Sequence, residues 1–341
     1  MQPELNLMSS GWSIALNTTG AYTIVDCVAS SVGTSITPRP NSVAVVLRVI
    51  GASGGIQLFL RQNGSTDDFA HACSDVAGMG SFIIGLDAAM KFQYFAGATG
   101  LTLEVMGFLS SQMCFMATNA TSKATVTVTS YVITTGITAQ GSDVPKAAIG
   151  FMSKIDSVSA IDGWYVRMNG STDTRQVAGS ATTSNDYVPF LTPVDGSNQF
   201  QQYINTVDQR CYCNGYLMNN TNTADTYITF ATNGTSRTTG TTGSFQTITA
   251  PAATGILAIF YEMFNSSASG IPTFELRGIG DSQDDSGNNQ ILSSGSGFNR
   301  YYALVPCLGA DQAQQKISTT NCLLFERGWI TATERGRTIV S

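Results

Sequence analysis

The chain has 341 residues, of which 12% are charged and 43% are hydrophobic. Charged residues are about half as frequent as the roughly 25% found in ordinary soluble domains, so neutral polar side chains must cover most of the surface. Its 17 basic and 23 acidic residues give a net charge of −6. With no basic stripe, the sequence argues against binding to a phosphate backbone. Its apolar runs are also too short for a membrane-spanning helix.

Residues 1–10 show no periodicity and are predicted to form a polar N-terminal arm. The same stretch lacks the basic and apolar segments of a secretory signal. We therefore expect a protein that is made and kept in a cytosol, or that leaves it by lysis.

The first predicted domain covers residues 11–115 and contains a hairpin in Ile56–Asp67, with the sequence IQLFLRQNGSTD. Leu58 and Leu60 stand two residues apart, which is the period of a strand with one buried face. The Asn-Gly pair that follows supplies the positive φ of a tight turn. The last strand of this domain is predicted to end near Leu109.

The hairpin recurs in a second domain, residues 116–222, as Asp162–Asp173, with the sequence DGWYVRMNGSTD. It recurs more faintly in a third domain, residues 223–341, as Pro272–Ser282, with the sequence PTFELRGIGDS. The second domain is predicted to open with an alternating strand over residues 124–134.

A closing strand also recurs in each domain and contains a glycine, namely Gly107, Gly215 or Gly328. Matches at fixed offsets indicate an internal triplication, and a repeat of this length suits one β-sandwich domain. Short strands punctuated by Gly, Asn and Pro predict an all-β chain of three tandem antiparallel β-sandwich domains, jelly-roll-like or of another Greek-key topology.

The seven cysteines are Cys27, Cys73, Cys114, Cys211, Cys213, Cys307 and Cys322. Their number is odd and their positions differ among the repeats, so they are predicted to be free thiols. Cys211 and Cys213 face the same side of one strand. A buried pair is favoured over a metal site, because no second pair or histidine joins them.

No catalytic, cofactor-binding or metal-binding residue is predicted. His71, the only histidine, lies near Asp68, Cys73 and Asp75 in a segment that suggests an exposed loop. Ser53 stands in a G-x-S-x-G pattern, but a strand rather than the required helix follows it.

A cluster of Asp281, Asp284, Asp285 and Asn288 offers oxygen ligands of the kind that Ca²⁺ prefers. An exposed turn is the favoured interpretation, since Asp, Asn and Gly are common in turns for conformational reasons.

Arg61, Arg167 and Arg277 end the repeated strand and project from the face opposite its buried residues. Each is either an outward arginine stacked on its neighbours or an anchor for a partner, since arginine and aromatic residues are frequent in contact patches. The same alternatives apply to Phe108, Tyr216 and Trp329, which follow the recurring glycines. These six residues are the candidate interface residues.

Three tandem β-domains with few charges and many Thr, Asn and Gly residues resemble accessory virion proteins of tailed bacteriophages. Head decoration or cement proteins and head fibres are the nearest types, and no family motif is matched. The resemblance implies a virion structural protein, assembled in the host cytoplasm, that decorates or cements the capsid shell. It also implies contacts with the major capsid protein or other virion proteins, a homotrimer, no cofactor and no enzymatic activity.

Two alternatives remain open at this point. A phage fibre or receptor-binding protein would recognise host surface glycans through aromatic, Asn and Asp side chains on loops. A carbohydrate-active enzyme would need two carboxylates in one groove, and nothing in the sequence positively suggests them.

Overall fold

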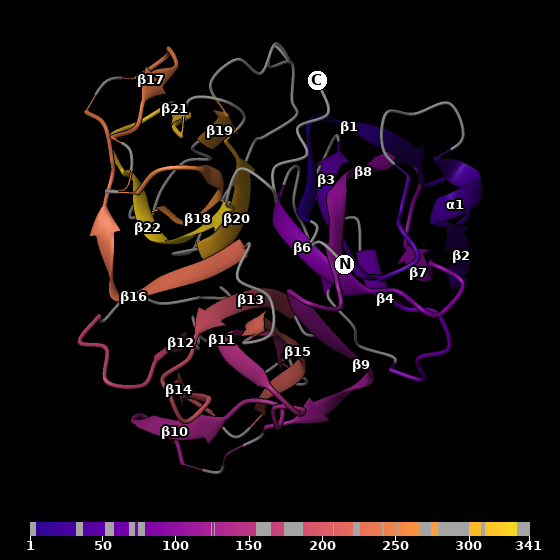
Figure 1. The fold of residues 1–341 in the computed structure, drawn as a ribbon, viewed down its shortest axis with the longest axis horizontal. Coiled ribbons are helices and arrows are strands. Elements are labelled where there is room, and N and C mark those ends of the chain that lie inside the picture. Colours follow the sequence, from indigo (N-terminus) through magenta and orange to yellow (C-terminus); the bar gives the residue numbers. More distant parts are fainter. Residues whose placement is uncertain are drawn as a thin grey trace.

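The computed structural model describes residues 5–31, 37–51, 58–67, 72–73, 79–123, 125, 127–154, 165–173, 187–206, 208–220, 226–240, 242–249, 251, 253–265, 274–278, 300–307 and 311–332. These residues form six antiparallel sheets and one short helix. Figure 1 shows three lobes around a common centre, coloured violet, magenta and orange-yellow in chain order. Each lobe is one copy of the repeat, so the predicted triplication is confirmed; we call the lobes units 1, 2 and 3.

Unit 1 is a jelly roll of two sheets. Its strands are β1 (Leu5–Ala15), β2 (Thr23–Asp26), β3 (Ser42–Gly51), β4 (Leu58–Gln62), β5 (Ala72–Cys73), β6 (Met79–Gly85), β7 (Lys91–Ala96) and β8 (Leu101–Ser110). One sheet has the order β1-β8-β3-β6 and the other β2-β7-β4-β5. Eight strands divided in this way between two sheets make a jelly roll, one of the topologies that the sequence left open.

Units 2 and 3 repeat this order. Unit 2 contains β9 (Cys114–Ser122), β10 (Tyr131–Thr135), β11 (Asp143–Lys154), β12 (Tyr165–Met168), β13 (Tyr187–Pro193), β14 (Gln199–Tyr203) and β15 (Gln209–Asn220). Unit 3 contains β16 (Thr226–Ser236), β17 (Gln246–Thr247), β18 (Ile256–Asn265), β19 (Phe274–Gly278), β20 (Arg300–Pro306), β21 (Ala313–Ile317) and β22 (Cys322–Ala332). Their sheets run β13-β11-β15-β9 with β10-β14-β12, and β16-β22-β18-β20 with β17-β21-β19.

The structure changes three of these expectations. β1 begins at Leu5, and within the expected arm of residues 1–10 Leu5, Asn6 and Leu7 pair with Leu109, Phe108 and Gly107 of β8. β9 begins at Cys114 and pairs with β15 of unit 2. The alternating strand expected over residues 124–134 is shortened to β10, because the chain crosses there between the two sheets of unit 2. Thr129, with a φ of 60°, lies on this crossing.

Helix α1 (Cys27–Ser30) has a local cause. Asp26 caps it, since its Oδ1 accepts hydrogen bonds from the amides of Val28 at 3.1 Å and Ala29 at 3.0 Å. These amides have no partner within a helix, and a capping carboxylate satisfies them.

The recurring glycines occupy equivalent positions in the last strand of each unit. Gly107, Gly215 and Gly328 face Val46, Ile149 and Phe260, and a β-bulge follows each pair. A Cβ at Gly215 or Gly328 would collide with a carbonyl oxygen of the unit's first strand, from Phe115 or Thr229. Glycine is needed because two backbones approach closely at the bulge.

The sheet of each unit that contains its first strand is here called the inner sheet. The outward faces of the three inner sheets meet in one apolar cluster, here called the central cluster. It combines Ala44, Val46, Ile83, Met106 and Leu109 of unit 1 with Cys114, Ala147, Ile149 and Leu217 of unit 2 and Ile228, Leu257, Ala258, Phe260, Leu304 and Ile330 of unit 3, and includes Met113 between the first two units. Burial of these faces joins the units into one body.

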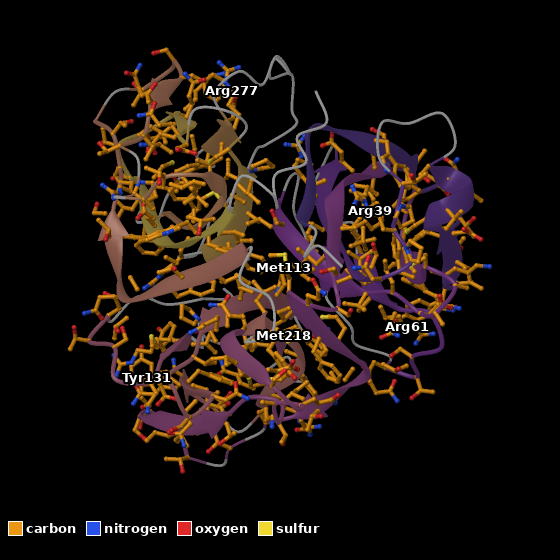
Figure 2. All side chains as sticks on the ribbon, in the orientation of Figure 1. Arg39, Arg61, Met113, Tyr131, Met218 and Arg277 are labelled. Carbon is orange, nitrogen blue, oxygen red and sulfur yellow. The ribbon has the colours of Figure 1, made fainter. Side chains whose placement is uncertain are left out.

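Equivalent residue pairs of the three units contribute to the central cluster. Ala44 faces Leu109, Ala147 faces Leu217 and Ala258 faces Ile330 across the same two strands of each unit. Figure 2 shows Met113 and Met218 near the centre of the molecule, where the Met218 amide donates to the Met113 carbonyl oxygen at 2.9 Å. The chain is thus a trimer-like arrangement of jelly rolls within one polypeptide.

Candidate functional site

Each repeated arginine lies on the outer sheet, the second sheet of its unit. Figure 2 shows Arg61, Tyr131 and Arg277 at the edges of three different lobes. The arginine Nε donates to the Oε1 of the glutamine opposite: Arg61 to Gln93 at 2.7 Å, Arg167 to Gln201 at 2.7 Å and Arg277 to Gln314 at 2.8 Å. The guanidinium carbon lies 3.4 Å from the ring centre of Tyr22, 3.5 Å from that of Tyr131 or 3.7 Å from that of Phe245.

These arginines therefore stack on neighbouring rings at a strand end, and such cation–π contacts stabilise the face. This is one of the two roles that the sequence offered. A further role in binding a partner stays a prediction.

In units 1 and 2 the arginine also holds the NGSTD turn. Its Nη1 donates to the main-chain oxygen of Asp67 at 2.7 Å, or of Asp173 at 2.9 Å. The turn glycines, Gly64 and Gly170, have φ values of 85° and 83°, a region that favours glycine.

The NGSTD turn of each of these units docks on the first strand of the next unit. Asn119 Oδ1 accepts from Ser65 Oγ at 3.0 Å and from the Thr66 amide at 2.9 Å, while the Ala120 amide donates to Asp67 Oδ2 at 2.7 Å. The motif is thus a junction between units.

The junction between units 2 and 3 repeats these bonds. Asn233 Oδ1 accepts from Ser171 Oγ at 2.8 Å and from the Thr172 amide at 3.0 Å, and the Gly234 amide donates to Asp173 Oδ2 at 2.8 Å. The sequence analysis did not predict these junctions between units. The first strands of units 2 and 3 nevertheless share a pattern, because residues 119–122 read NATS and residues 233–236 read NGTS.

The second junction also contains a buried charge cluster. Arg327 pairs with Asp173 of unit 2 and with Glu262 of its own unit. Burial works against the charged guanidinium, but the carboxylates of Glu262 and Asp173 outweigh it and raise the pKa of Arg327. A small cavity of about 30 Å³, lined by Arg167, Tyr302 and Arg327 among others, lies beside this cluster.

Phe108 and Tyr216 do not lie on the surface, which corrects the expectation that they could anchor a partner. Their exposed fractions are 1% and 0%, because the glycine bulge shifts the alternation and turns the next side chain inward. Tyr216 stacks on Phe115 with ring centroids 5.2 Å apart and donates to Asp143 Oδ2 at 2.8 Å. Trp329 is partly buried against the core shared by units 1 and 3.

The other candidate sites find no support in the described part of the chain. His71, Ser53 and the Asp281–Asp285 cluster lie outside the described residues. Cys211 and Cys213 are buried free thiols, as are the four other cysteines whose side chains are described. Within the described ranges, no group of three His, Cys, Asp or Glu side chains could hold a metal ion. No described helix is long and apolar enough to cross a membrane.

The outer sheet of unit 2 carries a row of three tyrosines, here called the tyrosine row. Tyr131 and Tyr165 flank Tyr203 in direct cross-strand pairs, with ring centroids 5.4 Å and 4.9 Å from that of Tyr203. The next cross-strand row is Ile133, Gln201 and Arg167. All these side chains are partly exposed, and Ile133 has an exposed fraction of 56%. The face offers aromatic rings, an exposed apolar side chain and one cation.

Comparisons with known proteins give weak structural likenesses. No protein-family model matches the chain, and no curated protein matches it. The N-terminal CBM22-1–CBM22-2 tandem domain of Xyn10C from Paenibacillus barcinonensis shows 11% identity over 66% of this chain and 94% of its own, with a TM-score of 0.18. A chain of Sulfolobus Turreted Icosahedral Virus shows 13% identity over 91% of this chain and 83% of its own, with a TM-score of 0.19. At such TM-scores neither likeness bears on function.

Proposed function

We propose that the protein is a virion structural protein that decorates or cements a capsid shell through protein–protein contacts. The observation that carries the proposal is the closure of three jelly rolls around one central cluster within a single chain. Jelly rolls recur in viral capsids, and a trimer-shaped block suits a lattice position of threefold symmetry. The proposal includes no catalytic residue and no cofactor.

In this proposal one chain occupies the lattice position that a homotrimer of smaller subunits would otherwise occupy. The sequence suggested self-association because a surface poor in charge protects sheets badly against pairing, and the resemblance to virion proteins implied a homotrimer. Since the inner-sheet faces already cover one another, association of whole chains is no longer needed to bury them. The expected partners are the major capsid protein or other virion proteins.

The contact surface in this proposal is the outer sheet of unit 1 together with helix α1, which follows β2. Ile24 of β2 and Val28 of α1 have exposed fractions of 53% and 49%. Exposed apolar side chains beside arginine and aromatic residues are typical of contact patches. Arg61 and Tyr22 supply those neighbours.

Co-sedimentation with phage heads that lack the protein tests the proposal, at low and at high salt. We expect binding with a shallow salt response, because few charges are available to be screened. Ile24→Asp should weaken binding, whereas Ile133→Asp, at the equivalent position of unit 2, should leave it unchanged. Absence of the protein from a mass-spectrometric inventory of purified particles would refute the proposal.

The second candidate is a fibre or receptor-binding protein that recognises surface glycans. The tyrosine row is the observation that favours it, since tyrosine combines an apolar ring with a hydrogen-bonding hydroxyl. Binding of the purified protein to host-cell polysaccharide, with no binding to heads, would replace the first candidate by this one.

A further inference from the structure

Among the described residues, no carboxylate pairs with Arg167, the cation beside the tyrosine row of unit 2. Arg167 donates to Gln201 Oε1 and to the main-chain oxygen of Asp173, and both acceptors are uncharged. Two other arginines differ, since the buried Arg48 pairs with Glu104 and the partly buried Arg237 pairs with Glu326. Positive charge is therefore available at this face of a chain whose net charge is −6.

The carboxylate at the opposite end of the face is already satisfied. Asp195 Oδ2 accepts from Asn169 Nδ2 at 2.8 Å, and its Oδ1 accepts from the amides of Ser197 and Gln199 at 2.8 Å and 2.9 Å. Burial works against ionisation, but these hydrogen bonds outweigh it and lower the pKa of Asp195. The acidic end is thus separated from the tyrosine row by the row that contains Arg167.

We propose that the tyrosine row and Arg167 bind an acidic oligosaccharide. The sugar rings would pack against the partly exposed tyrosines, and the Tyr203 hydroxyl would hydrogen-bond to the sugar. A carboxylate of the sugar would accept charge-assisted hydrogen bonds from Arg167. Charge complementarity selects an acidic saccharide over a neutral one, and the inference does not depend on docking to a shell.

The equivalent faces of the other units lack this combination. In unit 1 the row is Tyr22, Phe95 and Phe59, and Phe59 packs at the junction with unit 2. In unit 3, Lys316 occupies the central position and pairs with Glu275 at 3.1 Å. Among the described residues, the combination of the tyrosine row and an arginine without a carboxylate partner therefore occurs in unit 2 alone.

Isothermal titration of the whole chain with tetragalacturonate tests the inference, with maltotetraose as the uncharged probe. We expect binding of tetragalacturonate alone, and a weaker affinity at high salt, because added ions screen exposed charges. Equal binding of both probes, or no binding of tetragalacturonate at millimolar concentration, would overturn the proposal.

Ile133→Asp provides the matched variant, since this side chain is 56% exposed and its replacement disturbs no core. A carboxylate beside Arg167 should weaken tetragalacturonate binding at least about tenfold, because it competes for the guanidinium and repels the ligand. Ile24→Asp is the control, because it makes the same change at the equivalent position of unit 1. Equal losses in the two variants would place the binding elsewhere and refute the site.

Tyr203→Ala tests the tyrosine row directly. It should also weaken binding about tenfold, the cost of one lost stacking partner, while Tyr203→Phe keeps the ring and should lose less. Unchanged affinity in a folded Tyr203→Ala protein would overturn the role of the tyrosines, and circular dichroism of each variant establishes that it is folded.

Discussion

The shared central cluster predicts that damage in one unit is felt in all three. Phe260 of unit 3 has an exposed fraction of 1% and contacts this cluster. Phe260→Ala should cost about 3–5 kcal/mol, the usual loss for a buried phenylalanine. That is a large fraction of the roughly 5–15 kcal/mol that stabilises a native protein.

Hydrogen exchange followed by mass spectrometry can resolve the effect by unit. In Phe260→Ala we expect faster exchange in the inner strands β3, β11 and β18, because all three pack on the cluster. Phe200→Ala is the control, since Phe200 is equally buried but lies in a cluster built from unit 2 alone. Its effect should be concentrated in unit 2.

Faster exchange confined to β18 and its neighbours in Phe260→Ala would refute the coupling.

The shared central cluster also predicts the fate of a truncated chain that ends before Thr226. The sequence alone suggests that units 1 and 2 would stay folded without unit 3. The structure predicts aggregation instead, because the cut exposes apolar residues of β3, β8 and β11.

Asn233→Ala should lower the free energy of unfolding by about 1–3 kcal/mol, measured by urea denaturation, because two donors of the docking turn lose their acceptor; no change would show that the junction contributes nothing. Gly215→Ala should cost about 1–3 kcal/mol by crowding at the bulge, whereas Gly240→Ala, with open space around it, should stay within about 0.5 kcal/mol. Denatured, unreduced protein should titrate seven thiols, while burial raises the pKa of Cys27 and Cys307 from 9.0 to about 12 and should keep them unreactive in the native state at pH 8. Since the unfolded thiols ionise first, the free energy of unfolding should decline as pH rises from 9 to 12 and be unaffected by these groups below pH 9.

Several features of the protein follow from the sequence alone. Period-two patterns and Asn-Gly turns predicted strands and hairpins, because these signals depend on the local backbone and on one buried face. Fixed offsets identified the triplication and the equivalent positions of Arg61, Arg167 and Arg277. Even the outward direction of these arginines followed from the alternation with Leu58 and Leu60.

Other features depend on residues that are distant in the chain. Burial of Phe108 and Tyr216 follows from a bulge beside the preceding glycine, where the pairing with the neighbouring strand shifts register and changes the alternation of side chains. The role of NGSTD as a junction requires Asn119 or Asn233 of the next unit.

The tertiary structure alone decided that the three units form one body. An apolar alternating strand shows that it has a buried face, but not which surface covers that face. Ala44, Ala147 and Ala258 meet in the central cluster because the inner sheets bury their outward faces against one another. The tyrosine row likewise exists only through cross-strand register, which brings Tyr131, Tyr165 and Tyr203 together from separate strands.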